Sequence, residues 1–342
     1  MECALAEATA RHPDELWESH YTFGGRQVCM RVLGLELAEH ISRPFSHLKI
    51  NNDDTRIPDL TINLWDDRLA SDDRCLHWSD NGTGWHEATL ESPEGRFLGQ
   101  RLPNTLSCLD RMNKRILGTI AWHDKIFIYE RGKTLSRLLL NWCNDEGVQV
   151  THAGLVSRGD RGILFVGKSG SGKSTSSLAC LLAGFDYLGE DYVGLERCKN
   201  GVFVGHSLYN SVFLRTDQLG RFPTLAPHAV RGRLPHEEKS VIVLSQIYPE
   251  RLKQAVPIRA LVLPRITDIA SPQLRPASKG EALLALGPTS LLQIPNRGLG
   301  IGGFNKLAQL VESVPCFRLE VGSNIMAIPR CLEDLFVELS SK

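Results

Sequence analysis

Residues 161–175 read R-G-I-L-F-V-G-K-S-G-S-G-K-S-T. Gly162–Val166 is a short apolar run that predicts a buried strand. Gly167–Ser174 satisfies the pattern G-x-x-x-x-G-K-[ST], and Lys173–Leu182 reads as a helix with Gly184 near its C-terminal end. A strand, a glycine-rich turn and a helix in this order predict a phosphate-binding P-loop (Walker A) in an α/β fold.

Each position of the loop has a physical role. Gly167, Gly170 and Gly172 allow backbone conformations closed to other residues, so successive N–H groups can turn toward phosphate oxygens. The N-terminus of the following helix attracts the same anions. Lys173 would contact the β- and γ-phosphates, and Ser174 would ligate Mg²⁺. ATP and Mg²⁺ are therefore the expected cofactors.

The whole loop is assigned to nucleotide binding, although the side chains of Lys168 and Ser169 are expected to be incidental to the chemistry. The assigned residues are Gly167, Lys168, Ser169, Gly170, Ser171, Gly172, Lys173, Ser174 and Thr175.

An acidic pair, Glu190-Asp191, follows the next expected strand, which begins at Tyr187. In an open α/β sheet that end of a strand lies beside the crevice where ligands bind. One carboxylate could hold Mg²⁺ while the other accepts a proton from an attacking hydroxyl. The alternative is a solvated turn, and the position in the sheet favours function. His152, just before the strand that enters the loop, is by itself more typical of a structural histidine.

Three segments resemble the catalytic domain of HPr kinase/phosphorylase, in order and in spacing. They are T-H-A-G-L-V (151–156), the loop G-K-S-G-S-G-K-S-T (167–175) and L-G-E-D-Y-V (188–193). Further stretches are similar to HPr kinase-like proteins of bacterial genomes, some of which modify peptide natural products. These are S-L-Y-N-S (207–211), A-L-L-A-L-G-P-T-S-L (282–291) and V-P-C-F-R-L-E-V-G (314–322).

The resemblance covers about residues 125–340 and implies a P-loop fold related to phosphoenolpyruvate carboxykinase. It implies that Glu190 is the general base toward the acceptor hydroxyl, oriented by His152, and that Asp191 binds Mg²⁺ with Ser174. Lys173 completes the implied catalytic set. In the family the pair usually reads Asp-Asp. The extra methylene of Glu190 moves its carboxylate by about 1.5 Å, and displacements of this size matter in catalysis.

Composition bounds the remaining possibilities. The chain has 342 residues, is 42% hydrophobic and balances 39 basic against 39 acidic residues, so no global positive field favours nucleic acid or an acidic membrane as partner. The N-terminus lacks a basic-then-apolar start, and cytoplasm is the default expectation. Nine scattered cysteines without a C-x-x-C pair are expected to be reduced core thiols, not a disulfide framework or a zinc site.

The pattern changes near residue 145. We expect a mixed α+β domain over 1–145, a candidate for partner recognition, and an HPr kinase-like P-loop domain over 146–342. Further expected elements are a hairpin over Tyr21–Val32 with a Gly24-Gly25 turn, a turn at Asp80-Asn81-Gly82, strands at Ile126–Glu130, Ser240–Leu244, Ile258–Leu263 and Phe317–Val321, and helices at Thr134–Asp145 and Asn305–Val314.

The leading hypothesis is an ATP- and Mg²⁺-dependent kinase whose acceptor is the serine of a protein or peptide, encoded near this chain. The resemblance also implies self-association. A small-molecule kinase and a non-catalytic ATP-binding assembly or maturation factor remain open. A transporter-type ATPase is disfavoured because no L-S-G-G-Q-like segment is present. Arg259, Lys239 and Arg265 could contact phosphate from across the crevice, with Arg259 and Lys239 preferred equally, but each could also be a solvated surface charge. His206, His228 and His236 have no spacing that indicates a metal site.

Overall fold

The computed structural model describes residues 1–51, 56–69, 88–102, 104–120, 126–232, 238–292 and 300–340. The chain divides into two compact units. The first comprises Met1–Trp142 and Phe213–Val243, and the second comprises Cys143–Val212 and Leu244–Lys342. The sequence places one boundary at 145/146. In the structure the first unit ends at Trp142, three residues earlier. Phe213–Val243, which lies within the expected second domain, also belongs to the first unit.

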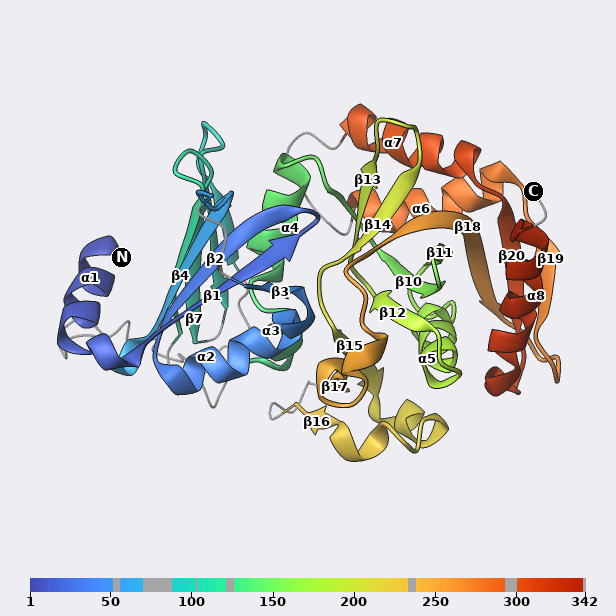
Figure 1. Ribbon diagram of the computed structural model, residues 1–342, viewed down its shortest axis with the longest axis horizontal. Coiled ribbons are helices and arrows are strands. Elements are labelled where there is room, and N and C mark those ends of the chain that lie inside the picture. Colours follow the sequence, from blue (N-terminus) through green and yellow to red (C-terminus); the bar gives the residue numbers. More distant parts are fainter. Residues whose placement is uncertain are drawn as a thin grey trace. The chain divides into compact units, whose positions relative to one another are not determined.

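The first unit is built mainly from strands (Figure 1). Its elements are α1 (Glu2–Arg11), β1 (Leu16–Phe23), β2 (Arg26–Leu33), α2 (Leu35–Ser42), β3 (Lys49–Ile50), β4 (Leu60–Asp66), β5 (Ala88–Glu91), β6 (Phe97–Leu102), β7 (Thr105–Asp110), β8 (Arg115–Ile120), α3 (Ile128–Gly132), α4 (Ser136–Asp145), β15 (Ser211–Arg215), β16 (Val230–Arg231) and β17 (Lys239–Val243), with 3-10 turns at Pro13–Glu15, Arg43–Leu48, Asp67–Leu69, Thr216–Arg221 and Ala226–His228. α4 and β15 run across the unit boundaries.

The larger sheet of the first unit is mixed, in the order β3-β1-β2-β4-β8-β7-β6-β5. β2, β4 and β8 are parallel, and the remaining neighbours are antiparallel. The hairpin of β1 and β2 turns at Gly24 and Gly25, whose φ angles of +55° and +78° suit a two-residue hairpin loop. This confirms the expected hairpin and its turn.

The second unit contains residues 161–175, with the glycine-rich loop. Its elements are β9 (Gln149–Thr151), β10 (Ala153–Arg158), β11 (Arg161–Val166), α5 (Lys173–Leu182), β12 (Asp186–Gly189), β13 (Val193–Arg197), β14 (Phe203–Ser207), β18 (Ala255–Ile266), β19 (Gln273–Pro276), α6 (Lys279–Leu292), α7 (Gly300–Ser313), β20 (Cys316–Val321) and α8 (Ile328–Ser340), with 3-10 turns at Leu244–Gln246, Pro249–Arg251 and Ile325–Ala327. β11, α5 and β12 follow one another as the sequence predicts, whereas β12, β13 and β14 then follow without an intervening helix, so the unit is a mixed α/β structure.

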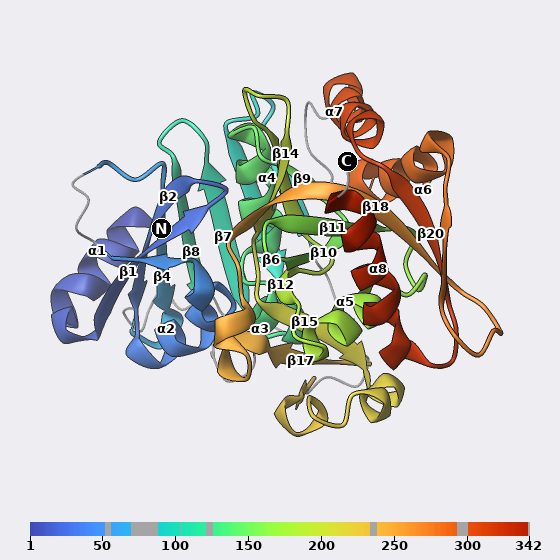
Figure 2. The same ribbon diagram turned by 45° about the vertical axis from the view of Figure 1, so that its right-hand side comes forward.

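The sheet of the second unit has the order β12-β10-β11-β18-β14-β13-β9, and β20 pairs with both β18 and β19. It is mixed: β11, β18 and β20 run parallel, and β10 is antiparallel to β11 and β12. α6 and α7 cover one face and α5 covers the other (Figures 1 and 2). Apolar side chains of the first face, such as Leu155 and Leu164, pack with Leu286 of α6 and Leu310 of α7 in one buried cluster.

The expected strands at Ser240–Leu244, Ile258–Leu263 and Phe317–Val321 are confirmed within about three residues, as β17, β18 and β20. The helices expected at Thr134–Asp145 and Asn305–Val314 are α4 and α7, and α5 has the expected bounds. The turn expected at Asp80-Asn81-Gly82 lies outside the described residues.

The strand expected at Ile126–Glu130 is wrong, because this segment enters the helix α3. A run of four apolar residues does not distinguish a strand from a buried helical turn. Here the helix is stabilised by residues that are distant in sequence, because Ile128 packs with Phe213 and Val241. Gly132 is also in close contact with them, since a Cβ on it would lie 2.6 Å from atoms of both.

The eight described cysteines are free thiols. Among the described helices, none has the length and apolar character needed to cross a bilayer.

The β6–β7–β8 meander provides a test of the fold. Asp110 is buried, accepts hydrogen bonds from Arg96 Nε at 3.0 Å and Asn113 Nδ2 at 2.6 Å, and its pKa is held well below the ordinary value, mainly by Arg96. We expect Asp110→Asn to lower the free energy of unfolding by about 1–2 kcal/mol at pH 7. Glu91→Gln, which loosens the ion pair with Arg111, should have a smaller effect because the carboxylate of Glu91 is more exposed than that of Asp110.

Because the folded pKa of Asp110 is depressed, its advantage over Asn is complete above the unfolded pKa of about 4 and shrinks as the pH falls further. Urea unfolding of the two variants and of wild type between pH 7 and pH 3 measures this. Equal stability of wild type and Asp110→Asn at pH 7 would contradict the assignment.

Candidate functional site

The ends of three neighbouring strands meet at one edge of the second unit's sheet. Ala153 of β10 lies opposite Val166 of β11, and Leu155 of β10 lies opposite Gly189 of β12. Because β10 runs against both neighbours, its first residues lie beside the last residues of β11 and β12. His152, the loop after β11 and the acidic pair after β12 are therefore brought to the same edge.

The loop between β11 and α5 is shaped by its glycines. Gly167, Gly170 and Gly172 have φ angles of +152°, +76° and +110°. A Cβ on Gly167 would lie 2.7 Å from Ser171 Oγ, so the loop also excludes a side chain there by contact. Gly172 lies against the ends of β18 and β20, with its Cβ position 3.6 Å from Pro264 Cβ. These contacts hold the loop at the carboxyl ends of the parallel strands, where ligands bind in open α/β sheets.

The ammonium group of Lys173 points back into the loop that precedes its helix. Nζ donates hydrogen bonds to the backbone oxygen of Gly167 at 2.8 Å and of Lys168 at 3.2 Å, and the residue is only 6% exposed. A buried cation at a helix N-terminus, ringed by a glycine-rich backbone, is a positive site for an anion. Ser174 and Thr175 follow in the first turn of α5, and both are partly exposed.

Asp191 and His152 are in direct contact. The Nε2–H of His152 donates to Oδ1 of Asp191 at 3.2 Å, and Oγ of Ser290 on α6 accepts from the backbone N–H of His152 at 3.2 Å. Asp191 has a φ of +62°, a left-handed conformation that costs energy for a residue with a side chain. The resemblance implies that His152 orients Glu190; the structure instead pairs it with Asp191, because the turn after β12 presents the second carboxylate to the start of β10.

Glu190 is 2% exposed, whereas the side chain of Asp191 is 27% exposed. Tyr187, two residues before Gly189, is also buried. Burial, together with the nearby charges of Glu190 and Asp191, raises the pKa of the Tyr187 hydroxyl well above its ordinary value. The tyrosine therefore stays protonated and neutral at physiological pH.

A cleft of about 740 Å³ opens beside the glycine-rich loop. Its walls are mostly apolar and come from the end of β18 and from α6, with Leu263, Ile266 and Leu284 among them. Lys168, Arg265 and Arg318 also line it. The guanidinium of Arg318 forms an ion pair with Glu281 of α6, whereas Arg265 has no ion-pair partner within the part of the chain that the structure describes.

The other basic candidates lie elsewhere. Arg259 is the extra residue of a bulge in β18, between the partners of Gly162 and Ile163, and it is exposed away from the residues that line the cleft. Lys239 belongs to the first unit, where its Nζ lies 5.9 Å from the ring centroid of Tyr129. Of the three, only Arg265 lines the cleft.

The histidines without an expected role are also placed. His206 lies 3.4 Å from Glu196 across the β13–β14 hairpin, and His228 ends a short 3-10 turn. His236 lies outside the described residues.

Sequence reasoning missed Arg318, Ser290 and the apolar wall of α6. Arg318 and the α6 segment occur inside two of the stretches that carry the resemblance, V-P-C-F-R-L-E-V-G and A-L-L-A-L-G-P-T-S-L. Their positions in the cleft could not be inferred because the pairing of β20 with β18 joins residues more than 50 apart.

The site has a group of anion-binding residues and a group of acidic residues at different strand ends, called here the positive pole and the negative pole. The loop, Lys173 and the N-terminus of α5 form the positive pole at the end of β11, and Glu190 and Asp191 form the negative pole at the end of β12. β10 lies between these two strands, so the ends of β11 and β12 are about 10 Å apart, which is two strand spacings. A polyanion held at one pole could therefore meet a general base or a bound cation at the other.

Comparison with known proteins adds little to this geometry. No family model matches the chain, and no curated protein matches it. Among solved structures, the HPr(Ser) kinase/phosphatase from Coxiella burnetii is similar at 11% sequence identity and a TM-score of 0.31, over 56% of this chain and 99% of that chain. A likeness at this level carries no argument about fold or function, which rest on the geometry described above.

The packing of α5 on β10, which positions the loop, can be tested with a pair of variants. A Cβ on Gly154 of β10 would lie 2.5 Å from Oγ of Ser177 on α5, and that oxygen is buried with no hydrogen-bond partner among the described residues. We expect Gly154→Ala alone to destabilise the protein by about 1–3 kcal/mol through overpacking.

Ser177→Ala alone should be close to neutral, since it removes a buried hydroxyl that makes no hydrogen bond, and the double variant should recover much of the lost stability. A double-mutant cycle by urea unfolding measures the coupling. Additive effects would show that α5 does not approach β10 as closely as described.

Proposed function

We propose that this chain binds ATP with Mg²⁺ on the loop Gly167–Thr175 and transfers the γ-phosphoryl group to a hydroxyl, that of a serine in a protein or peptide acceptor. The observation that carries the proposal is the Lys173 ammonium folded into a glycine-bordered loop at the same sheet edge as two carboxylates. A cation buried among backbone groups, with acidic side chains across one strand, is the combination that phosphoryl transfer requires.

The residues present fit a nucleoside triphosphate. Nζ of Lys173 is held by two carbonyl oxygens of the loop, so phosphate oxygens would replace hydrogen-bond acceptors that are already there. The cleft beside the loop has the volume of a small-molecule site, and its apolar wall with flanking Arg265 and Lys168 suits a flat base joined to a negatively charged chain. We therefore place the nucleoside portion in this cleft.

The residues present also fit a divalent cation. Ser174 at the start of α5 and Asp191 at the end of β12 would hold Mg²⁺, which prefers oxygen ligands. Bound there, Mg²⁺ would supply charge neutralisation for the phosphates. The hydrogen bond from His152 to Oδ1 of Asp191 orients this carboxylate.

We propose Glu190 as the general base that accepts the proton of the acceptor hydroxyl. Its neighbour Tyr187, with a pKa above the ordinary value, stays protonated and does not compete for that role. A carboxylate that is 2% exposed can act on an acceptor only when the turn after β12 opens, and the left-handed backbone of Asp191 marks that turn as the strained point.

The same burial favours a second candidate, an assembly or maturation factor that binds ATP without transferring phosphate. Glu190 in its present position cannot reach a hydroxyl in solvent. A small-molecule kinase is the third reading, since the cleft alone does not distinguish a peptide serine from a metabolite hydroxyl. The assays below separate the three.

The phosphate site is tested by Lys173→Ala. Loss of a charge-assisted contact costs about 1.5–3 kcal/mol, so we expect Mg²⁺-ATP to bind about 10–100-fold more weakly, as measured by calorimetry. Lys199→Ala, in the exposed turn between β13 and β14, serves as the matched control and should bind like wild type. Unchanged affinity in Lys173→Ala would remove the loop from the proposal.

The two carboxylates are tested by separate readouts. We expect Glu190→Gln to keep ATP affinity and to lower phosphoryl transfer by about 10²–10⁴-fold. Asp191→Asn and His152→Asn should instead raise the Mg²⁺ concentration needed for half-maximal activity, because both disturb the same contact. Radiolabelled ATP, incubated with peptides and proteins encoded beside this chain and with small hydroxyl compounds, reports the transfer.

A normal transfer rate in Glu190→Gln would mean that another residue is the base. A normal Mg²⁺ titration in Asp191→Asn would contradict its role as ligand. If wild type binds ATP but labels nothing in the full set of acceptors, the non-catalytic factor is the better account.

A further inference from the structure

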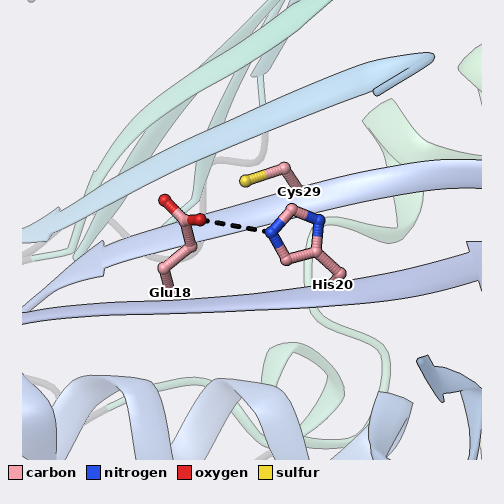
Figure 3. A group of neighbouring side chains, drawn as sticks. All are labelled: Glu18, His20 and Cys29. Carbon is pink, nitrogen blue, oxygen red and sulfur yellow. Dashed lines mark hydrogen bonds and ion pairs between the residues drawn. The ribbon is translucent and has the colours of Figure 1, made fainter. Parts of the chain in front are cut away.

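Three side chains with metal-binding atoms lie together on the hairpin of β1 and β2 in the first unit. Glu18 and His20 are two residues apart on β1 and so share one face, and Cys29 of β2 is the direct cross-strand partner of His20. Figure 3 shows the carboxylate, the imidazole ring and the thiol gathered on the same side of the hairpin. The alternate residues of β1, Ser19 and Tyr21, are buried on the opposite face.

The three donor atoms are close enough to share one ion. A carboxylate oxygen of Glu18, a ring nitrogen of His20 and Sγ of Cys29 all lie within 4.8 Å of one another, and Oε1 of Glu18 is 3.2 Å from Nε2 of His20. Ligands of a tetrahedral zinc ion at ordinary bond lengths are about 3.3–3.8 Å apart. Small rotamer changes, with no movement of the strands, would therefore complete the geometry.

We propose that Glu18, His20 and Cys29 form a binding site for a transition-metal ion of the zinc type. One oxygen, one nitrogen and one sulfur ligand form a mixed set that suits zinc and cobalt and is a poor match for Mg²⁺ or Ca²⁺, which take oxygen ligands. The site shares no residue with the glycine-rich loop of the second unit, so it does not depend on the proposed phosphotransferase function.

Arg31 supports the carboxylate from its other side. Its Nε donates to Oε2 of Glu18 at 2.6 Å, whereas His20 lies on Oε1. A ligating carboxylate is commonly held by such an outer partner, which fixes its orientation.

The ligands differ in access to water. Cys29 is 2% exposed, and its burial, together with the charge of Glu18, raises the pKa of the thiol, which would lose its proton on binding the metal. The side chains of His20 and Glu18 are 17% and 36% exposed. Three protein ligands with one open side leave a fourth position for water, the arrangement of zinc sites that bind an exchangeable ligand.

Cobalt(II) is the probe for this site because a cobalt–thiolate bond gives a charge-transfer band in the near ultraviolet that oxygen and nitrogen ligands do not give. The full-length chain, first treated with chelator, is titrated with Co²⁺. We expect the band in wild type, its loss in Cys29→Ser and its retention in the matched control Cys3→Ser, a change at an exposed thiol of α1.

Glu18→Gln and His20→Asn should each weaken Co²⁺ binding by at least about tenfold. The loss of a residue that only supports a metal ligand already weakens binding by about this factor, and the loss of a ligand should cost more. Lys173→Ala should keep the band, which separates this site from the phosphate site. Absence of the band in wild type, its survival in Cys29→Ser, or unchanged affinity in both Glu18→Gln and His20→Asn would overturn the proposal.

Thermal unfolding of each apo variant shows whether it is folded. A second measurement needs no variant: X-ray absorption of the zinc-loaded wild-type chain should give one sulfur in the first shell with nitrogen and oxygen ligands. A shell of oxygen and nitrogen alone would exclude Cys29 and with it the proposed site.

Discussion

The candidate phosphate site depends on the pairing of one strand that runs against both of its neighbours. β10 is antiparallel to β11 and β12, so its start and their ends lie at one edge. Packing on both faces of β10 fixes its register. Leu155 packs in the cluster with residues of α6 and α7, and on the other face Gly154 lies so close to α5 that a Cβ there would be 2.5 Å from Oγ of Ser177. A slip of one residue would reverse these faces and move His152 away from Asp191.

The local parts of this site follow from the sequence because short-range chemistry determines them. A positive φ at the loop glycines, the strand before the loop and the helix from Lys173 are all encoded within twenty residues. The partner of His152 and the place of Arg318 depend on contacts between distant strands, which no local pattern specifies. For the same reason α3 could not be distinguished from a strand: its stabilising contacts with Phe213 and Val241 come from much later in the chain.

The hairpin of β1 and β2 could be predicted from the sequence, whereas the metal-binding side chains that it brings together could not. Its Gly24-Gly25 turn is a local signal, and a two-residue turn determines every cross-strand pair, including His20 with Cys29. Spacing along the chain gave no reason to associate these residues with a metal, since the usual zinc patterns count positions in sequence. Cys29 was therefore expected to be only a core thiol, and the structure adds the neighbouring imidazole and carboxylate.

The division of the chain has a consequence for the order of folding during synthesis. The first unit needs Phe213–Val243, which leaves the ribosome only after β9 to β14 of the second unit have been made. Domains generally fold as units as they emerge, but here the cluster of Ile128, Phe213 and Val241 must wait for about 70 intervening residues beyond Trp142. A fragment that stops at Trp142 would lack Phe213 and Val241, so cutting the chain once does not separate the two units.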